Sequence, residues 1–517
     1  TANKCVTIVD EDRNLDTGAN GLGLNLTVKP TGNLNIASGQ DLTITDFVKV
    51  DAGGVLEIEN TASLIQVNNV ANIGNVNSRR IAVTNNTLDY VYWSTPVAGF
   101  SVNNVTPSST YRYAWNPTVN NGGTYLGNFG NWVGASGAMT TGRGYIIRGS
   151  SGNTTFTGVP NNGNITIPIT RGTYTSLTNY TGPTDTPVTK DDDNWNLLGN
   201  PYPSALSADA FLTANLANLA PSVKIWTHGI DPAAIADPFY QDYQLNYNTS
   251  DYITYNRLGG TQAGFDGYIG SGQGFFVLMN DAGATTENAV FNNTMRSNAF
   301  RNDQFYRAGD TFERHRIWLK IISPTNTTND MLVGYTTEAT NGFDSIFDTQ
   351  NVGVKTNFEI YSLIENSGYI IQGRGLPFDN NDQIPLGVSV PQNGIYVIAI
   401  DAVDGLFTNT TQNIYLEDTT LGITHDLRAA PYSFTANVGR FDNRFVLKFK
   451  NETLGNEDFT ANTVMVYAND NINVVANNQT IKSVRVHDLL GRVLGTFNNV
   501  NSSTFETKNI AKTQSAL

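Results

Sequence analysis

The chain has 517 residues and a formal net charge of −14 at pH 7, and only 15% of its residues are charged. Globular domains usually contain about 25% charged residues. Here glycine, asparagine and threonine replace them, and these residues favour turns and strands. The acidic balance argues against nucleic-acid recognition, which needs clustered lysine and arginine. No segment approaches the roughly 18 apolar residues of a membrane-spanning helix, so we expect a soluble, all-β protein that does not itself span a membrane.

The single cysteine, Cys5, excludes an intrachain disulfide, and we expect its side chain to be buried or unreactive. No basic-then-apolar signal peptide opens the sequence. We interpret the chain as a mature protein from which a signal peptide has been removed, rather than as a cytoplasmic protein.

Residues 1–78 contain an internal repeat. Val28–Ile36 aligns with Val50–Ile58 at an offset of 22, with Val, Gly, Leu and Ile at matched places. Short strands that recur at a period near 20 are typical of solenoid rungs, which bury their apolar faces only by stacking. The pattern predicts about three β-solenoid-like rungs between residues 15 and 75. A β-meander with a chance repeat is the alternative.

Residues 79–300 contain a second, weaker duplication. Tyr92–Val97 resembles Leu197–Tyr202, because in both an apolar strand is stopped by proline. Downstream, Gly142–Ile147 resembles Gly272–Val277 in the same order. We predict two related β-modules in tandem. One helix is expected as an insertion within this region that covers one end of a sheet. Ser204 or Ser207 can cap it, and its apolar stripe is formed by Phe211, Leu212, Asn215, Leu216 and Leu219.

Residues 301–450 show apolar or alternating segments at regular spacing, separated by turn signals such as Asn341-Gly342. Eight or nine strands in this length predict a β-sandwich, jelly-roll-like or immunoglobulin-like. A polar linker is predicted at 451–462. A further strand series from 463 to 517 indicates a small second sandwich.

No pattern in the sequence indicates a catalytic site, and we expect a non-enzymatic protein without a cofactor. The four histidines show no zinc-binding spacing, and the glycines at 270–274 run into a strand rather than a helix. The acidic loops leave two interpretations open: solvated turns or weak Ca²⁺ sites, with a glycosidase acid–base pair a more distant alternative. The candidate ligands are Asp191, Asp192, Asp193, Asp379 and Asp382.

Aromatic residues are concentrated between 79 and 300, which holds five of the six tryptophans. Tryptophan and tyrosine on a sheet face can stack on sugar rings. Trp115, Trp132, Tyr243 and Tyr247 lie in loop-like stretches and form a possible glycan platform. The alternative is that these aromatic residues fill the cores of the two modules.

The C-terminal segment resembles a known family. Val464–Tyr467, Asn473–Val475 and Ile481–Leu494 are similar to the type A C-terminal sorting domain of Bacteroidetes proteins that are exported by type IX secretion. The shared pattern is an apolar strand that enters Asp-Leu-x-Gly-Arg, with His487 where tyrosine is common. The residues that carry it are Val484, Val486, Asp488, Leu489, Gly491 and Arg492.

The resemblance implies a route and partners. Such proteins cross the inner membrane with a cleaved signal peptide and the outer membrane through the type IX translocon, and a shuttle protein engages their sorting domain. The passenger is then secreted or held at the cell surface. The family usually continues for one or two strands beyond the last residues of this sequence, which implies a sorting domain truncated at its C-terminal end.

The preceding modules also resemble passenger regions of flavobacterial cell-surface proteins, through Trp195–Ser204, Gly272–Val277 and Phe445–Phe449. We therefore expect an exported, adhesin-like or structural surface protein that contacts other cells or surface glycans. The alternatives are a secreted polysaccharide-binding protein or glycoside hydrolase with the same export signal, and a spacer within a larger assembly.

Overall fold

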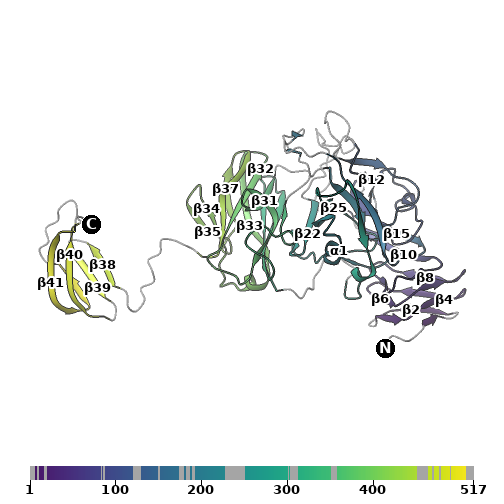
Figure 1. Cartoon of the computed structure of the whole chain (residues 1–517), viewed down its shortest axis with the longest axis horizontal. Helices are drawn as coiled ribbons and strands as arrows, with labels where there is room; N and C mark the ends of the chain where they lie inside the picture. Colours follow the sequence, from purple (N-terminus) through teal and green to yellow (C-terminus); the bar gives the residue numbers. More distant parts are fainter. Residues whose placement is uncertain are drawn as a thin grey trace. The chain divides into compact units, whose positions relative to one another are not determined.

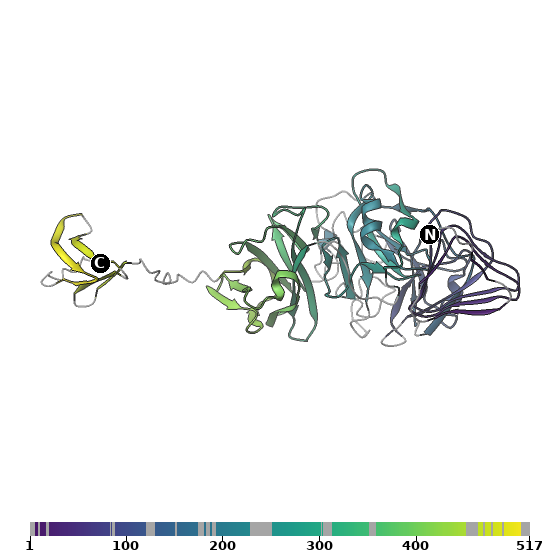
Figure 2. The same ribbon diagram turned by 90° about the horizontal axis from the view of Figure 1, so that it is seen from below.

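The structure is a computed structural model, shown in two views in Figures 1 and 2. It describes residues 6–8, 11–16, 20–82, 84, 88–119, 130–149, 152–173, 180–181, 187–188, 193–227, 251–300, 302, 313–350, 358–450, 464–468, 471–476, 479–488 and 491–507. The predicted all-β class is confirmed: strands dominate these residues, and α1 (Ala208–Asn215) is the one α-helix among them. The chain forms two compact units, Thr1–Lys450 and Asn451–Leu517.

The first unit begins with a solenoid of three parallel sheets. Leu26 pairs with Val48, Asn33 with Val55 and Asp41 with Ser63, so the 22-residue repeat of the sequence is the offset between stacked strands. In the strands between Leu26 and Ile58 every second residue is buried, as the alternation in the sequence requires. The solenoid strands are β1 (Val6–Ile8), β2 (Asp12–Leu15), β3 (Gly21–Gly23), β4 (Leu26–Val28), β5 (Asn33–Ile36), β6 (Asp41–Ile44), β7 (Val48–Val50), β8 (Val55–Ile58) and β9 (Ser63–Gln66).

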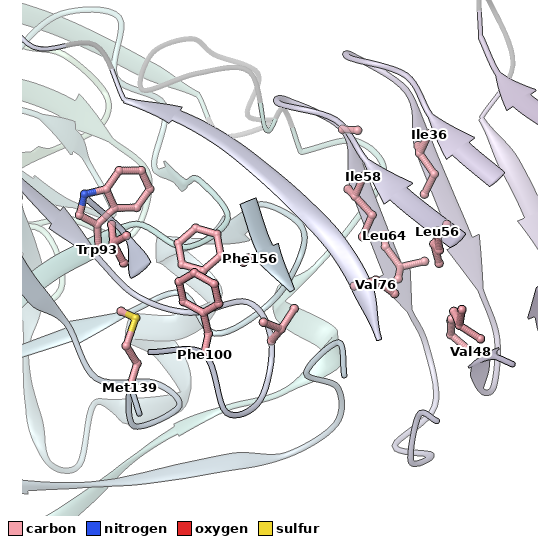
Figure 3. Close-up of a cluster of buried hydrophobic side chains, with 14 of the residues drawn as sticks. Ile36, Val48, Leu56, Ile58, Leu64, Val76, Trp93, Phe100, Met139 and Phe156 are labelled. Atoms are coloured by element: carbon pink, nitrogen blue, oxygen red, sulfur yellow. The ribbon is translucent and has the colours of Figure 1, made fainter. Parts of the chain in front are cut away.

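The solenoid and the first of the tandem modules share a strand and a core. Strand β10 (Val76–Ala82) pairs in parallel with β8 and antiparallel with β15 (Gly152–Gly158), so it runs across position 78, where the sequence analysis places a boundary. Figure 3 shows Ile36, Ile58 and Leu64 of the solenoid in one cluster with Trp93 and Phe156 of the module. The apolar end of the stack is thereby covered by the next module.

The tandem modules repeat one sheet topology. The first sheet has the order β11-β14-β12-β13, and the second has the order β19-β25-β21-β22-β23. In both sheets the strand of the first matched segment pairs with the strand of the second, β11 with β14 and β19 with β25. The strands are β11 (Tyr90–Trp93), β12 (Arg112–Asn116), β13 (Asn131–Gly134), β14 (Tyr145–Arg148), β19 (Trp195–Gly199), β21 (Leu219–Trp226), β22 (Tyr252–Asn256), β23 (Gly259–Gly260) and β25 (Gly274–Met279). Smaller pairs join β16 (Ile165–Thr170) to β26 (Thr286–Phe291), β17 (Tyr180–Thr181) to β18 (Pro187–Val188), and β20 (Leu206–Ser207) to β24 (Tyr268–Ile269).

The duplicated motifs contact one another reciprocally. The amide of Ser94 donates to the carbonyl of Gly272 (2.7 Å), and the amide of Gly199 donates to the carbonyl of Gly142 (3.0 Å). The proline-ended motif of each copy therefore contacts the glycine-containing motif of the other copy. Reciprocal contacts of this kind are those of an interface with approximate two-fold symmetry. At Gly199 this close approach leaves no room for a side chain. A Cβ atom at Gly199 would lie 2.3 Å from Cβ of Ser94.

Replacing Gly199 with alanine is expected to destabilise the first unit by about 1–3 kcal/mol, because the added methyl group overpacks a buried contact. Gly134→Ala is the matched control, since a Cβ at Gly134 has no atom within 4 Å. Urea denaturation of both variants measures the difference. Equal stability of the two variants would contradict the close approach of the duplicated motifs.

Helix α1 starts where the sequence predicts and ends earlier. The Ser207 hydroxyl caps it by accepting from the amide of Ala210 (3.2 Å), and Phe211 and Leu212 are buried. The helix ends at Asn215, whose side-chain amide donates to the carbonyl of Val290 (3.0 Å). The predicted stripe therefore breaks: Leu216 is exposed, and Leu219 begins strand β21.

The last part of the first unit is one continuous, nearly closed sheet. Its strand order is β35-β34-β37-β32-β30-β31-β28-β27-β33-β36, with β29 paired to β31. The two layers predicted for a sandwich are thus joined by hydrogen bonds around a single core. The strands are β27 (Arg314–Ile322), β28 (Thr328–Thr336), β29 (Thr349–Gln350), β30 (Glu359–Ile364), β31 (Ser367–Gly375), β32 (Gln383–Val390), β33 (Gly394–Val403), β34 (Tyr415–Asp418), β35 (Ile423–Asp426), β36 (Tyr432–Ala436) and β37 (Gly439–Lys448).

Side chains bridge the gap between the two ends of this sheet. Asp418 on β34 accepts from Arg444 on β37 (2.8 Å) and from the Tyr432 hydroxyl on β36 (3.0 Å). Arg444 also donates to the backbone carbonyl of Thr435 on β36 (2.9 Å). We call Asp418, Arg444 and Tyr432 the seam cluster, because it connects β36, at one end of the sheet, to the paired strands β34 and β37 near the other end.

The second unit consists of two small antiparallel sheets. One has the order β38-β39-β42 and the other is the hairpin β40-β41. Phe497 and Phe505 touch across them, with ring centroids 4.9 Å apart. The strands are β38 (Val464–Ala468), β39 (Ile472–Ala476), β40 (Ile481–His487), β41 (Val493–Ser502) and β42 (Thr504–Glu506).

Candidate functional site

The turn of the hairpin β40-β41 is the best-defined candidate site. The Asp488 carboxylate accepts from the backbone amide of Arg492 (2.9 Å) and from its Nε (2.6 Å). The backbone amide of Asp488 donates to the carbonyl of Arg492 (2.9 Å), and Gly491 donates to the carbonyl of Asp488 (3.0 Å). One carboxylate therefore joins the two ends of the turn and fixes where the strands start.

Glycine is needed at the fourth position of the Asp-Leu-x-Gly-Arg motif because of its backbone conformation. Gly491 has φ +79°, in the left-handed region that side chains disfavour, while a Cβ there would meet no atom within 4 Å. The turn therefore demands glycine through its conformation rather than through packing. This turn geometry requires the spacing of the motif, with the aspartate and the arginine at the two ends of the turn and the glycine directly before the arginine.

The turn presents its arginine to solvent. The Arg492 side chain is 76% exposed, whereas the Asp488 side chain is 12% exposed. Val484 and Val486 on β40 are half-buried and pair with Phe497 and Gly495 of β41. Thus five of the six predicted motif residues lie on one hairpin. The sixth, Leu489, lies outside the described residues.

Apolar side chains are unusually exposed in the second unit. Val464 and Val466 on β38 pair with Ala476 and Val474, which are buried, but are themselves exposed. Val493 and Leu494 on β41 are exposed as well. Among the residues that the structure describes, this unit therefore leaves part of its apolar side chains exposed to solvent.

The aromatic residues of the tandem modules form a second candidate site, a cluster between the two sheets. Trp115 and Trp132 meet edge to face with centroids 5.1 Å apart, and both pack against Phe276. Tyr92 stacks on Trp226 (5.8 Å), and its hydroxyl is hydrogen-bonded to that of Tyr252. These contacts join the two copies of the module through their aromatic faces.

This placement favours the core interpretation over a glycan platform. Trp115 and Trp132 are each 7% exposed, and the indole nitrogen of Trp115 donates to the carbonyl of Trp195 (2.8 Å). A sugar ring cannot stack on faces that other rings already cover. The other two platform residues, Tyr243 and Tyr247, lie outside the described residues.

The acidic candidates for Ca²⁺ have other partners where they are described. Both oxygens of Asp382 accept from Arg374, and one also accepts from the Tyr335 hydroxyl (2.7 Å). Asp379 accepts from the backbone and side-chain nitrogens of Asn381, which closes a turn. Asp193 is buried, and Asp191 and Asp192 lie outside the described residues. Asp379 therefore fits the predicted turn, whereas Asp382 forms a buried ion pair with Arg374 that the sequence analysis did not predict.

Two further observations apply to the described part of the chain. It holds no group of three or more histidine, cysteine, aspartate or glutamate side chains arranged to bind a metal ion. Within those same ranges, no helix combines the length and the apolar character needed to cross a membrane.

Sequence reasoning missed two buried arginines that connect distant segments. Arg296 donates to the carbonyl of Leu64 (2.6 Å) and the hydroxyl of Ser204 (2.9 Å), and it lies 4.5 Å from the centre of the Tyr202 ring. Burial lowers the pKa of Arg296 to about 10, and Tyr202 opposes the shift, so the side chain stays charged at neutral pH. Arg80 donates to the carbonyl of Asn302 (3.0 Å).

Sequence reasoning also missed the seam cluster. The charged side chains of its Asp418 and Arg444 are nearly inaccessible to solvent. Burial would raise the pKa of Asp418, but hydrogen bonds from Arg444 and Tyr432 outweigh it and hold that pKa below its usual range. Burial likewise raises the pKa of Tyr432 to about 12. No spacing rule could have found the cluster, because Tyr432 on β36 meets Asp418 and Arg444 only when the sheet curls.

Comparisons with known proteins give two family matches. A family model described as a domain of unknown function (DUF8693) matches residues 1–449, and another described as a domain of unknown function (DUF8694) matches residues 454–517. The gap between the two matches, residues 450–453, contains the boundary between the two compact units. Neither a curated protein nor a solved structure matches the chain. Since the first model covers most of the sequence, the chain belongs to the family described as a domain of unknown function (DUF8693).

Proposed function

We propose that the chain is an exported, modular surface protein, adhesin-like or structural, whose second unit is read as a sorting signal by a type IX secretion apparatus. The observation that carries the proposal is the solvent-facing Asp488–Arg492 turn on a unit that is compact by itself. A receptor that recognises many different passengers needs a signal whose structure does not depend on the passenger. A turn held by one carboxylate on a small separate unit meets that need.

The first unit suits the role of passenger. Its solenoid, tandem modules and nearly closed sheet are joined by shared cores and by buried arginines. Such a unit presents extended sheet surface without relying on disulfides. A polysaccharide-binding function receives less support, because the described tryptophans of the proposed platform are buried.

The turn geometry predicts the effect of Gly491→Val on export. A β-branched residue at φ +79° costs roughly 1–2 kcal/mol and distorts the turn, so surface delivery should fall at least tenfold. The chain is expressed with a cleavable signal peptide in a bacterium that has a type IX apparatus. The fraction at the cell surface is then measured by labelling of intact cells.

Gly39→Val is the matched control, because Gly39 also has a positive φ (77°) and no atom within 4 Å of its Cβ position, but it lies in the solenoid. We expect Gly39→Val to be exported normally. Absence of the unmodified chain from the surface, or equal export of both variants, would overturn the sorting role.

A further inference from the structure

The outward face of the hairpin β40-β41 carries polar side chains and an arginine, Arg485, that has no carboxylate partner among the described residues. Arg485 and His487 on β40 are exposed and alternate with the half-buried Val484 and Val486. Among the described residues, no carboxylate lies within ion-pairing distance of Arg485 or of Lys482, three residues earlier on the strand. Opposite Arg485 lies Thr496, which is also exposed.

This pattern differs from the first unit, where many cations are neutralised. Arg374 pairs with Asp382 (2.5 Å), and Lys448 pairs with Glu417 (2.5 Å). In the hairpin the one carboxylate is Asp488, and it is already engaged by Arg492. The hairpin is thus a locally basic surface on a chain whose net charge is −14.

Apolar and hydrogen-bonding groups lie beside these cations. Val493 is 54% exposed and is paired with His487 across the hairpin, and Ser483 is paired with Asn498. We call the surface formed by these side chains the basic hairpin face, which consists of Ser483, Arg485, His487, Val493, Thr496 and Asn498, with Arg492 at the turn. This surface combines charged, polar and apolar side chains. Such a combination is typical of a protein interface, which has an apolar centre and a polar rim, rather than of a sheet face that contacts only water.

We propose that the basic hairpin face docks on an acidic protein surface, one that offers carboxylates to Arg485 and Arg492 and an apolar contact to Val493. The proposal rests on the proposed function, and it specifies the chemistry of the receptor that reads the sorting signal. Uncompensated charge on one partner steers association with the opposite charge on the other. The carboxylate of Asp488 orients Arg492 through Nε and leaves its two terminal nitrogens available for a bidentate contact.

An acidic protein fits this surface better than an anionic membrane. Recognition of anionic lipid takes clusters of about four to eight lysines or arginines. The described hairpin has three such residues, Lys482, Arg485 and Arg492. It also has polar side chains, those of Ser483, Thr496 and Asn498, which can form directional hydrogen bonds with a protein partner.

The test compares charge variants of the full chain in the export assay described above. Arg485→Glu should lower surface delivery about tenfold or more, whereas Arg485→Lys, which keeps the charge, should stay within twofold of the unmodified chain. Arg13→Glu is the off-site control, because Arg13 is exposed on the solenoid. Thermal unfolding of the purified variants should show equal stability, since Arg485 faces Thr496 and no carboxylate across the hairpin.

Photo-cross-linking then identifies what touches the face. A photoreactive residue at Thr496 should form an adduct with a protein segment rich in aspartate and glutamate, and Arg485→Glu should abolish that adduct. Sedimentation of the full chain with phosphatidylglycerol vesicles should leave it in the supernatant. Adducts to lipid, vesicle binding, adducts to a neutral or basic segment, or normal export of Arg485→Glu would each overturn the inference. If Gly491→Val still blocks export in that last case, the sorting role stands and only the docking chemistry is wrong.

Discussion

Replacing Arg444 with methionine is expected to reduce the free energy of unfolding of the first unit by about 3–5 kcal/mol, because it leaves a buried carboxylate without its cation. The side chain of Asp418 is 0% exposed, and that of Arg444 is 10% exposed. The substitution removes two hydrogen bonds to Asp418 and one to the carbonyl of Thr435. Urea denaturation monitored by tryptophan fluorescence measures the loss.

The matched control is Arg440→Met on the same strand. Arg440 pairs with Asp442, but their side chains are 46% and 40% exposed, so this pair and the contact of Arg440 with the Tyr361 ring contribute only about 1 kcal/mol. The double variant Arg444→Met with Asp418→Leu should recover much of the loss, because it removes the buried charge as well. Equal losses at Arg444 and Arg440 would show that the seam cluster does not hold the sheet ends together.

The pH dependence distinguishes a charge effect from a packing effect. Because the folded-state pKa of Asp418 lies below its unfolded value of about 3.9, its contribution is present above that pH and is lost as the pH falls through the folded-state pKa. In Arg444→Met, burial without the cation should raise this pKa instead. The stability gap between the two proteins should therefore narrow from pH 7 towards pH 3, whereas a pure packing defect would leave it constant.

Replacing Arg296 with methionine should destabilise the first unit by about 3 kcal/mol or more. The guanidinium donates to Leu64 of the solenoid, to Ser204 of the second module, and to Asn162 (3.2 Å) and Asn293 (3.1 Å). Each hydrogen bond to a charged group contributes about 1.5–3 kcal/mol, and the buried carbonyl of Leu64 and hydroxyl of Ser204 would lose this donor. Arg296→Lys should show an intermediate loss, since an ammonium cannot reach all of these acceptors.

Arg112→Met serves as the control for this experiment. Arg112 also donates to backbone carbonyls, those of Thr106 (3.0 Å) and Pro107 (3.1 Å), but in a more exposed place. We expect a loss below about 1 kcal/mol there. Limited proteolysis should in addition release the solenoid more readily from Arg296→Met than from Arg112→Met. If the solenoid stays equally protected, Arg296 does not join the two parts.

Much of the local structure could be predicted because it follows from short-range rules. The 22-residue repeat implies stacked strands, since a rung can bury Leu34 and Ile36 only against its neighbours. The cap at Ser207 and the glycine of the Asp488–Arg492 turn are equally local, because backbone donors and φ angles decide them.

Other features could not be predicted, because the residues that make them are far apart in the chain. The same tryptophans serve a glycan platform when they face solvent and a core when a second sheet covers them. Trp115 is covered by Phe276, more than 150 residues later, as well as by the nearer Trp132. The acidic loops behave alike: Asp382 is a plausible Ca²⁺ ligand by sequence, but Arg374 takes both of its oxygens in the fold.

The sequence by itself determined the all-β class, the stacked repeat, the duplication and the glycine turn of the second unit, since periodicity and backbone conformation are properties of neighbouring residues. The tertiary structure decided which aromatic faces stay buried, how the two copies of the duplicated motif meet, and how Asp418 and Arg444 close the last sheet. These depend on long-range pairing, where desolvation and the fit between sheets, rather than local preference, set the outcome.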